Sequence, residues 1–218
     1  MIDELLPPSV SGVDTRGDDV PTDLLFPQEE EAVRLAVPKR QREYRTVRAC
    51  ARRALAELGL PPVPVLSGPR GEPLWPEGVV GSMTHCDGYR AAAVARAAQF
   101  RTVGIDAEPH AALPAGVLDA IALPDELIRV TRDSCEGNVH WDRLLFSAKE
   151  SIFKATYPVS GIALEFSDAE VTFVRPTDAL DRGEFDVRLT RPVPMPPSPL
   201  RGGWLVRDGL VLTALIIK

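Results

Sequence analysis

The spacing of apolar residues predicts two long amphipathic helices, one in each half of the chain. Between Pro38 and Gly59, apolar side chains recur three or four positions apart, and these two residues suit a first helical turn and a C-terminal cap. A second stretch, from His140 to Thr156, has the same spacing, with Pro158 soon after its expected end. The buried stripes would consist of Tyr44, Val47, Ala51, Leu55 and Leu58 in the first helix, and of Trp141, Leu145, Ala148 and Ile152 in the second.

Shorter apolar runs elsewhere predict strands, separated by segments rich in turn-forming residues. Asp208-Gly209 predicts a tight hairpin between the last two. Weaker helices are expected from Pro27 to Glu31 and around Leu113–Leu123, and the first twenty or so residues, rich in Pro, Ser, Gly and Asp, predict an irregular start. The expected strands cover residues 63–66, 74–75, 89–94, 102–105, 170–174, 184–189, 204–207 and 210–217.

The order of these elements predicts an α+β fold made of two halves of similar size. Each half would consist of a long helix and the strands that follow it, in residues 1–102 and residues 103–218. A chain of 218 residues with 44% hydrophobic side chains can form one large domain or two small ones.

Charge and cysteine content narrow the class of function. The formal net charge of −6 argues against a general nucleic-acid-binding protein, which is usually basic. Cys50, Cys86 and Cys135 are odd in number and lack the spacing of a metal site or redox motif, which favours a reducing compartment. Neither an apolar run of membrane-spanning length nor the basic start of a signal peptide is visible, so we expect a cytoplasmic protein.

Two pairs of ionisable residues are candidates for metal and phosphate chemistry. Asp106 and Glu108 lie two positions apart at the end of an apolar strand, so both carboxylates point to one side and could share a hard cation. Glu150 and Lys154 lie four positions apart on the second helix, away from its apolar stripe, and would add a third carboxylate and a cation for phosphate. Taken singly, the pairs are more simply explained as a solvated acidic turn and a surface ion pair.

A histidine and several arginines are candidates for binding phosphate. His85 closes the segment Gly81-Ser82-Met83-Thr84-His85, although a lone histidine is more often structural. The arginines are most simply solvated side chains, but several on one helix face would suit a multiply phosphorylated ligand. They are Arg40, Arg45, Arg48 and Arg52 of the first helix, and Arg70 of a turn-rich segment.

In combination, these segments resemble the Sfp-type 4′-phosphopantetheinyl transferase family. SMTH, VGIDAEP and FSAKESIFK match, in order, the family's Ser-x-x-His, V/I-G-I/V-D-x-E and K-E-x-x-x-K patterns, the last preceded by an aromatic residue. The likeness runs from about residue 38 to residue 156, and the length fits the two-lobed type, whose two α+β halves are related by a pseudo-two-fold axis. Two departures are visible: Phe146 replaces a common tryptophan, and Ser67 stands where some relatives have a basic residue, which leaves one phosphate contact open.

The resemblance implies a transfer of 4′-phosphopantetheine from coenzyme A (CoA) to a serine of an acyl or peptidyl carrier protein, with release of adenosine 3′,5′-bisphosphate. Mg²⁺, or Mn²⁺ in its place, would be bound by Asp106, Glu108 and Glu150. The catalytic residues would be Glu150, which takes the serine proton, Lys154, which neutralises the pyrophosphate, and Asp106. The adenosine phosphates would be held by Arg40, Arg48 and His85, with Arg70, Ser82 and Thr84 nearby. A monomer without nucleic-acid or membrane partners is expected.

Two other functions would use the same residues. A Mg²⁺-dependent phosphodiesterase or pyrophosphatase would activate water with these carboxylates, but three histidines without paired ligand spacing fit its usual second metal shell poorly. A non-catalytic CoA- or nucleotide-binding protein would not need Glu150 as well as Asp106 and Glu108.

The segment between the second and third motifs has two possible roles. Because the chain is itself negative, bulk attraction would not draw in acidic carriers, so an apolar contact is one hypothesis. The alternative is that these side chains cap the core of the second half. They are Leu113, Val117, Leu118, Ile121 and Leu123.

Overall fold

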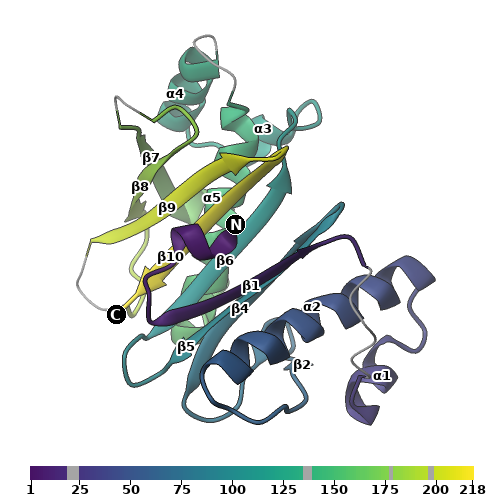
Figure 1. The fold of residues 1–218 in the computed structure, drawn as a ribbon. Coiled ribbons are helices and arrows are strands. Elements are labelled where there is room, and N and C mark those ends of the chain that lie inside the picture. Colours follow the sequence, from purple (N-terminus) through teal and green to yellow (C-terminus); the bar gives the residue numbers. More distant parts are fainter. Residues whose placement is uncertain (19–24, 135–138, 177–178, 196–198) are drawn as a thin grey trace.

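The computed structural model describes residues 1–18, 25–134, 139–176, 179–195 and 199–218. Two antiparallel sheets pack face to face, and one long helix covers the outer side of each (Figure 1). These helices are α2 (Pro38–Glu57) and α5 (Trp141–Ser160). The predicted α+β class with two α+β halves is confirmed, whereas the boundary at residue 102 stays a prediction. None of the described helices has the length and apolarity that a membrane span requires.

The first sheet has a central strand that is buried on both faces. Its order is β1 (Val10–Arg16), β5 (Tyr89–Arg96) and β4 (Val79–Cys86). Along β5, Ala92 and Val94 face α2, whereas Ala91, Ala93 and Ala95 face the second sheet. Because a strand alternates its side chains between two faces, this run of small residues lets both neighbouring layers approach β5 closely. Beside α2 lie helix α1 (Pro27–Val33) and the short hairpin of β2 (Leu66–Ser67) and β3 (Pro73–Leu74).

The second sheet separates the inter-sheet core from the core beneath α5. Along β10, Leu210, Leu212 and Ala214 face the first sheet, whereas Val211 and Leu215 face α5. The predicted hairpin is confirmed, with φ of 50° at Asp208 and 74° at Gly209. The sheet order is β6 (Thr102–Pro109), β10 (Leu210–Ile217), β9 (Leu200–Arg207), β8 (Arg182–Leu189) and β7 (Ala169–Val174).

Two hydroxyl groups join the edge strands of the two sheets. Ser82 Oγ of β4 accepts a hydrogen bond from Ile105 N of β6 at 3.2 Å, and Thr84 Oγ1 accepts one from Ala107 N at 3.1 Å. No backbone ladder between β4 and β6 is found among the described residues, so these side chains satisfy donors that the sheet edge would otherwise leave unpaired. The joint aligns the SMTH and GIDAEP segments side by side.

Strand β6 also lies directly on α5. A Cβ atom added at Gly104 would meet Ser151 O of α5 and would lie 2.6 Å from Ala155 N. Only a residue without a side chain permits this approach of strand and helix. The contact places the carboxylates of β6 next to the polar face of α5.

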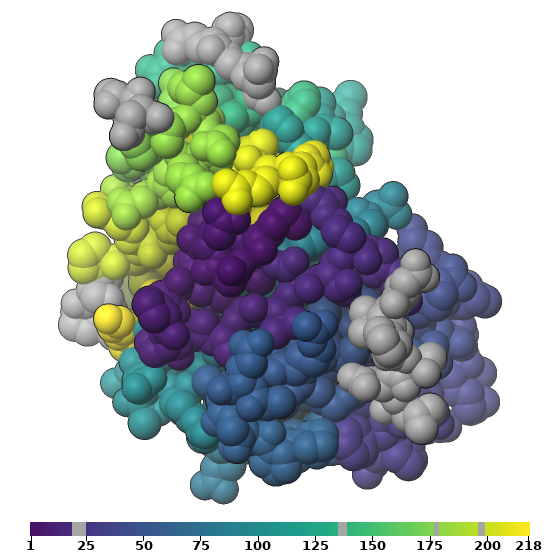
Figure 2. Space-filling view, viewed as in Figure 1, coloured from purple at the N-terminus to yellow at the C-terminus, as the bar shows by residue number. Residues whose placement is uncertain are grey.

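The beginning of the chain is more ordered than the sequence predicts. Residues Ile2–Leu5 form a 3₁₀ helix, η1, and the whole of β1 pairs with β5, from Tyr89 to Ala95. Ile2 is fully buried in the inter-sheet core, and the N-terminal segment lies across both halves (Figure 2). The expectation of an irregular start was wrong. The sequence did not reveal β1 because its two buried residues, Val10 and Val13, lie three positions apart and lack the alternation of a half-buried strand. Residues 19–24 lie outside the described part.

Several element boundaries also differ from the predictions. Helix α5 continues through Pro158 and ends at Ser160, and Gly161, whose φ is 67°, caps it. Strand β4, which carries the SMTH segment, and helix α4 (Pro124–Ser134) were not predicted, and the expected helix over residues 113–123 is only α3 (Val117–Ile121). The C-terminal end of α2 before Gly59 is confirmed, with φ of 73° at that glycine.

We predict that Gly104→Ala destabilises the protein severely. The added methyl group collides with backbone atoms of α5, so β6 and α5 must separate, and we expect the free energy of unfolding to fall by about 3 kcal/mol. Denaturant unfolding of the purified variant measures this. Gly203→Ala in the same sheet is the control, because its Cβ would lie 3.3 Å from the side-chain atom Leu5 Cδ2 and 3.9 Å from Gly183 O, without a backbone collision. Equal stability losses in the two variants would contradict the close approach at Gly104.

Candidate active site

Asp106 is a buried carboxylate with one unpaired oxygen. Its side chain projects from β6 toward α5, and the residue is 4% exposed. Oδ1 accepts hydrogen bonds from Thr84 Oγ1 at 3.1 Å and from Lys154 Nζ at 2.6 Å. Oδ2 is buried and has no hydrogen-bond partner. An unpaired buried carboxylate oxygen is costly, and a hard cation would satisfy it.

Glu108 lies on the same side of β6, as predicted from its two-residue spacing from Asp106. Burial, together with the charge of Asp106, raises the pKa of Glu108. Its charged form is held by Arg143 Nη1 of α5 at 2.8 Å. Sequence analysis missed Arg143, although its position seven residues before Glu150 places both on one face of α5.

Glu150 lies between two cavities of about 190 and 200 Å³, and Phe153 lines both of them. Burial raises the pKa of Glu150 against the opposing charge of Lys154, and Asp106 adds to the rise. Ile152, Leu164 and Phe166 are among the residues that line the first cavity, and Arg70, Ser82 and Lys154 are among those that line the second.

The donor set fits a hard divalent cation, although it is not assembled as a closed metal centre. Within the described residues, no three His, Cys, Asp or Glu side chains stand together as metal ligands. Asp106 and Glu108 are instead neutralised by Lys154 and Arg143. An unpaired Asp106 oxygen and two neighbouring carboxyls with raised pKa values are the features that an added positive charge would relieve.

Arg40 and His85 lie together at the C-terminal end of β4. Arg40 Nη1 is 2.6 Å from His85 Nε2. Burial and the neighbouring Arg40 lower the pKa of His85 to about 4, so the ring is neutral at physiological pH. Because Nε2 then accepts the guanidinium hydrogen, the ring proton lies on Nδ1, which can donate to an anion.

Arg48 and Arg52 are buried, which corrects their interpretation as solvated side chains. Arg48 donates to Val65 O at 3.2 Å and to Ser67 Oγ at 3.1 Å, and its guanidinium lies 3.4 Å from the centre of the Tyr44 ring. Burial lowers the pKa of Arg48 to about 10, so it stays charged at neutral pH. Arg52 pairs with the fully buried Glu29 at 3.0 Å.

The remaining candidates, Arg70 and Ser82, line the second cavity. Arg70 is exposed in the turn between β2 and β3, with its guanidinium 6.0 Å from the centre of the Tyr157 ring of α5. Ser82 lines the cavity but is buried, and its hydroxyl is engaged with β6. The structure therefore brings Asp106, Thr84 and Lys154 into direct contact, pairs Arg40 with His85, and directs Arg48 toward Ser67.

A buried ion pair that sequence analysis missed secures the segment before Glu150. Lys149 Nζ donates to Glu126 Oε2 at 2.7 Å, to Ile121 O at 2.9 Å and to Phe166 O at 2.8 Å. Glu126 Oε1 in turn accepts from Val171 N at 2.6 Å. Each charge is thus fully paired, and the pair fastens α3, α4 and β7 to α5.

The same region bears on the two roles proposed for the segment after the second motif. Ile121 is buried in the core beneath α5, and Leu113, Val117 and Leu118 pack against that core while partly exposed. The capping role fits this packing, and the apolar contact with a carrier stays a prediction.

Comparisons with known proteins give one consistent result. Residues 28–95 match the model of the 4′-phosphopantetheinyl transferase N-terminal domain, and residues 102–187 match that of the 4′-phosphopantetheinyl transferase superfamily. The chain is 51% identical to 4′-phosphopantetheinyl transferase Svp of Streptomyces mobaraensis over 93% of this chain and 82% of the relative. It is 45% identical to Npt of Nocardia iowensis over 99% of both chains. Identity to PptT of Mycobacterium tuberculosis is 49%, over 88% of this chain and 86% of the relative.

We predict that Lys149→Met lowers the free energy of unfolding by about 3–5 kcal/mol, because it leaves the Glu126 carboxylate buried without a counter-ion. Equilibrium unfolding in denaturant is the measurement. The double variant Lys149→Met/Glu126→Gln removes both charges and should lose less stability than the single variant. A double variant at least as unstable as Lys149→Met would show that the buried charge is not the cause.

Proposed function

This chain belongs to the Sfp-type 4′-phosphopantetheinyl transferases, which use CoA to activate carrier proteins, and we propose that it does so with a Mg²⁺ ion bound by Asp106, Glu108 and Glu150. The unpaired Oδ2 of Asp106 is the observation that carries the proposal. Mg²⁺ prefers a few carboxylates completed by substrate phosphate oxygens. Burial raises the pKa of two of the three proposed ligands, Glu108 and Glu150, and a bound cation would oppose that rise. When bound, the ion would neutralise negative charge on the CoA pyrophosphate.

The side chains around that position suit attack by a serine on the β-phosphate of CoA. Glu150 would accept the serine proton, and its raised pKa makes it a better base than an ordinary carboxylate. Lys154 lines the same cavity and would donate to the pyrophosphate as adenosine 3′,5′-bisphosphate leaves. Arg143 would keep Glu108 charged and oriented through their hydrogen bond.

The adenosine phosphates would be bound on the first half of the chain. Arg40 and the Nδ1–H of His85 offer adjacent donors, and Arg70 lines the second cavity. Arg48 would contribute its charge while holding the β2 segment through Val65 and Ser67, and Ser82 and Thr84 would act by positioning β6. The first cavity, which Ile152, Leu164 and Phe166 line beside Glu150, offers room for the pantetheine arm.

Carrier domains of the acyl and peptidyl types are the proposed acceptors, and a monomer is the proposed active form. The serine must reach Glu150, so the carrier would dock where the two cavities open on either side of that residue.

We predict that the wild-type protein, mixed with CoA, Mg²⁺ and an apo carrier domain, adds one phosphopantetheine arm to the carrier. Intact-protein mass spectrometry detects the gain. Asp106→Asn and Glu150→Gln should each lower kcat about a thousandfold, since each removes a proposed metal ligand.

Asp87→Asn is the matched control, because Asp87 is exposed in the turn after β4 and pairs only with the exposed Lys39 among the described residues. Activity within about tenfold of wild type in both site variants would refute the ligand assignment. Hydrolysis of CoA without a carrier would instead support the phosphodiesterase alternative.

A further inference from the structure

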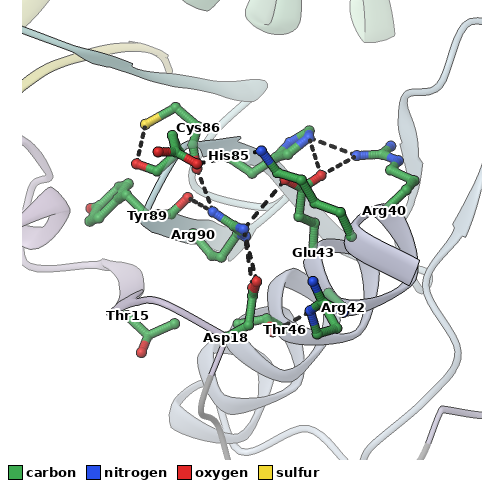
Figure 3. A network of polar contacts seen from close by, with 12 residues as sticks. Thr15, Asp18, Arg40, Arg42, Glu43, Thr46, His85, Cys86, Tyr89 and Arg90 are labelled. Carbon is green, nitrogen blue, oxygen red and sulfur yellow. Dashed lines mark hydrogen bonds and ion pairs between the residues drawn. The ribbon is translucent and has the colours of Figure 1, made fainter. Parts of the chain in front are cut away.

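Behind Arg40 and His85 lies a network of charged side chains that the proposed reaction does not use (Figure 3). Glu43, one turn along α2 from Arg40, is its centre and is 12% exposed. Oε2 of Glu43 lies 3.8 Å from Arg40 Nη1 and 3.7 Å from His85 Nε2, while Oε1 lies 3.5 Å from Arg90 Nη2. One carboxylate therefore connects the phosphate-facing pair to a residue of β5.

Arg90 anchors this network, because backbone carbonyls and carboxylates hold its side chain in place. Its side chain is 2% exposed and donates to two carbonyls of the β4–β5 turn, Cys86 O and, at 2.8 Å, Tyr89 O. The Nη2 atom that faces Glu43 also pairs with Asp18 Oδ1, at 3.1 Å. A guanidinium held in this way by backbone and carboxylate cannot itself reach a ligand, but it can fix the carboxylates that approach it.

The charges of the network cancel. Arg40 and Arg90 offset Glu43 and Asp18, and His85 is neutral. Loss of Arg90 would leave the group with one net negative charge, and the carboxylate nearest to Arg40 and His85 would be Glu43. Glu43 would then repel an anion that approaches Arg40, and it would also bind the Arg40 guanidinium more tightly.

The position of His85 indicates which phosphate is concerned. Thr84 and His85 are neighbours on β4, so their side chains leave opposite faces of the strand. Thr84 contacts Asp106 and Lys154, where the pyrophosphate is proposed to lie, whereas His85 faces α2. A phosphate at His85 is therefore separate from the pyrophosphate, and in CoA this is the 3′-phosphate.

We propose that Arg90 is a positioning residue for recognition of the 3′-phosphate of CoA: it anchors Glu43 and cancels its charge, so that Arg40 and His85 face the phosphate together. This inference rests on the proposed function, in which Arg40 and His85 bind an adenosine phosphate. Arg90 acts without touching the substrate.

The test compares CoA with 3′-dephospho-CoA as phosphopantetheine donors. Arg90→Met should raise KM for CoA about tenfold and leave kcat within about twofold, because the 3′-phosphate is remote from the reacting phosphorus. KM for 3′-dephospho-CoA should stay within about twofold of wild type, since that donor has no group to be repelled. The double variant Arg90→Met/Glu43→Gln, which removes the uncompensated charge, should recover most of the CoA affinity.

Matched variants separate this role from a general effect on folding. Arg96→Met removes another arginine of β5, one that donates to Leu58 O, and should leave the ratio of the two KM values unchanged. Glu43→Asp keeps the charge but shortens the reach toward Arg40 and His85, and should raise KM for CoA alone even if Arg90→Met does not fold.

Two outcomes would overturn the inference: KM values for both donors that rise equally in Arg90→Met and Glu43→Asp, or a double variant no better than Arg90→Met. Arg40→Ala distinguishes this from a failure of the proposed function. If Arg40→Ala changes the ratio of the KM values for CoA and 3′-dephospho-CoA and the Arg90 and Glu43 variants do not, only the role of Arg90 is wrong. If Arg40→Ala leaves that ratio unchanged, the assignment of Arg40 to the 3′-phosphate fails.

Discussion

The arrangement of the site depends on the contact between β6 and α5 at Gly104. Strand β6 carries Asp106 and Glu108, and α5 carries Arg143, Glu150 and Lys154, so the distance between these two elements decides whether the charges meet. At Gly104 the backbone of β6 lies almost against that of α5. Two residues further along β6, the side chain of Asp106 is therefore close enough to pair with Lys154 of α5. The hydroxyl joint from β4 fixes the other side of β6. A strand held on both sides in this way cannot shift its carboxylates independently of the helix.

Each long helix is held against neighbouring segments by a buried ion pair, because a helix has no β-ladder hydrogen bonds to hold it there. Arg52 and Glu29 fasten α1 and the β2 segment to α2, and Lys149 and Glu126 do the same for α3, α4 and β7 on α5. Such pairs contribute little net stability compared with apolar contacts of the same size, but leaving one partner alone is costly. They therefore favour one arrangement of each helix over alternatives, close to the proposed site residues.

The sequence predicted the elements whose pattern is local and missed those defined by distant partners. Apolar spacing located α2 and α5, and Asp208-Gly209 located the last hairpin. Strand β1 was missed because its burial depends on β5 and not on its own alternation, and Pro158 was taken to follow the helix although it lies in its last turn. At the site, motif order identified Asp106, Glu108, Glu150 and Lys154. The partners Arg143, Glu43 and Arg90 carry no motif, so only their contacts in the structure identify them.

The inter-sheet core joins the two ends of the chain, which bears on how the protein acquires its structure during synthesis. Ile2 packs in the same cluster as Leu205 and Leu212, so this early segment is buried only after residues far along the chain have been synthesised. Strand β6 likewise cannot join a sheet until β10 has been synthesised, because β10 is its only ladder partner among the described residues. Contacts of such long sequence separation slow folding, and the face of the first sheet that packs on the second stays uncovered until β10 has been synthesised. Nascent chains halted before β10 would therefore be the species most dependent on chaperones.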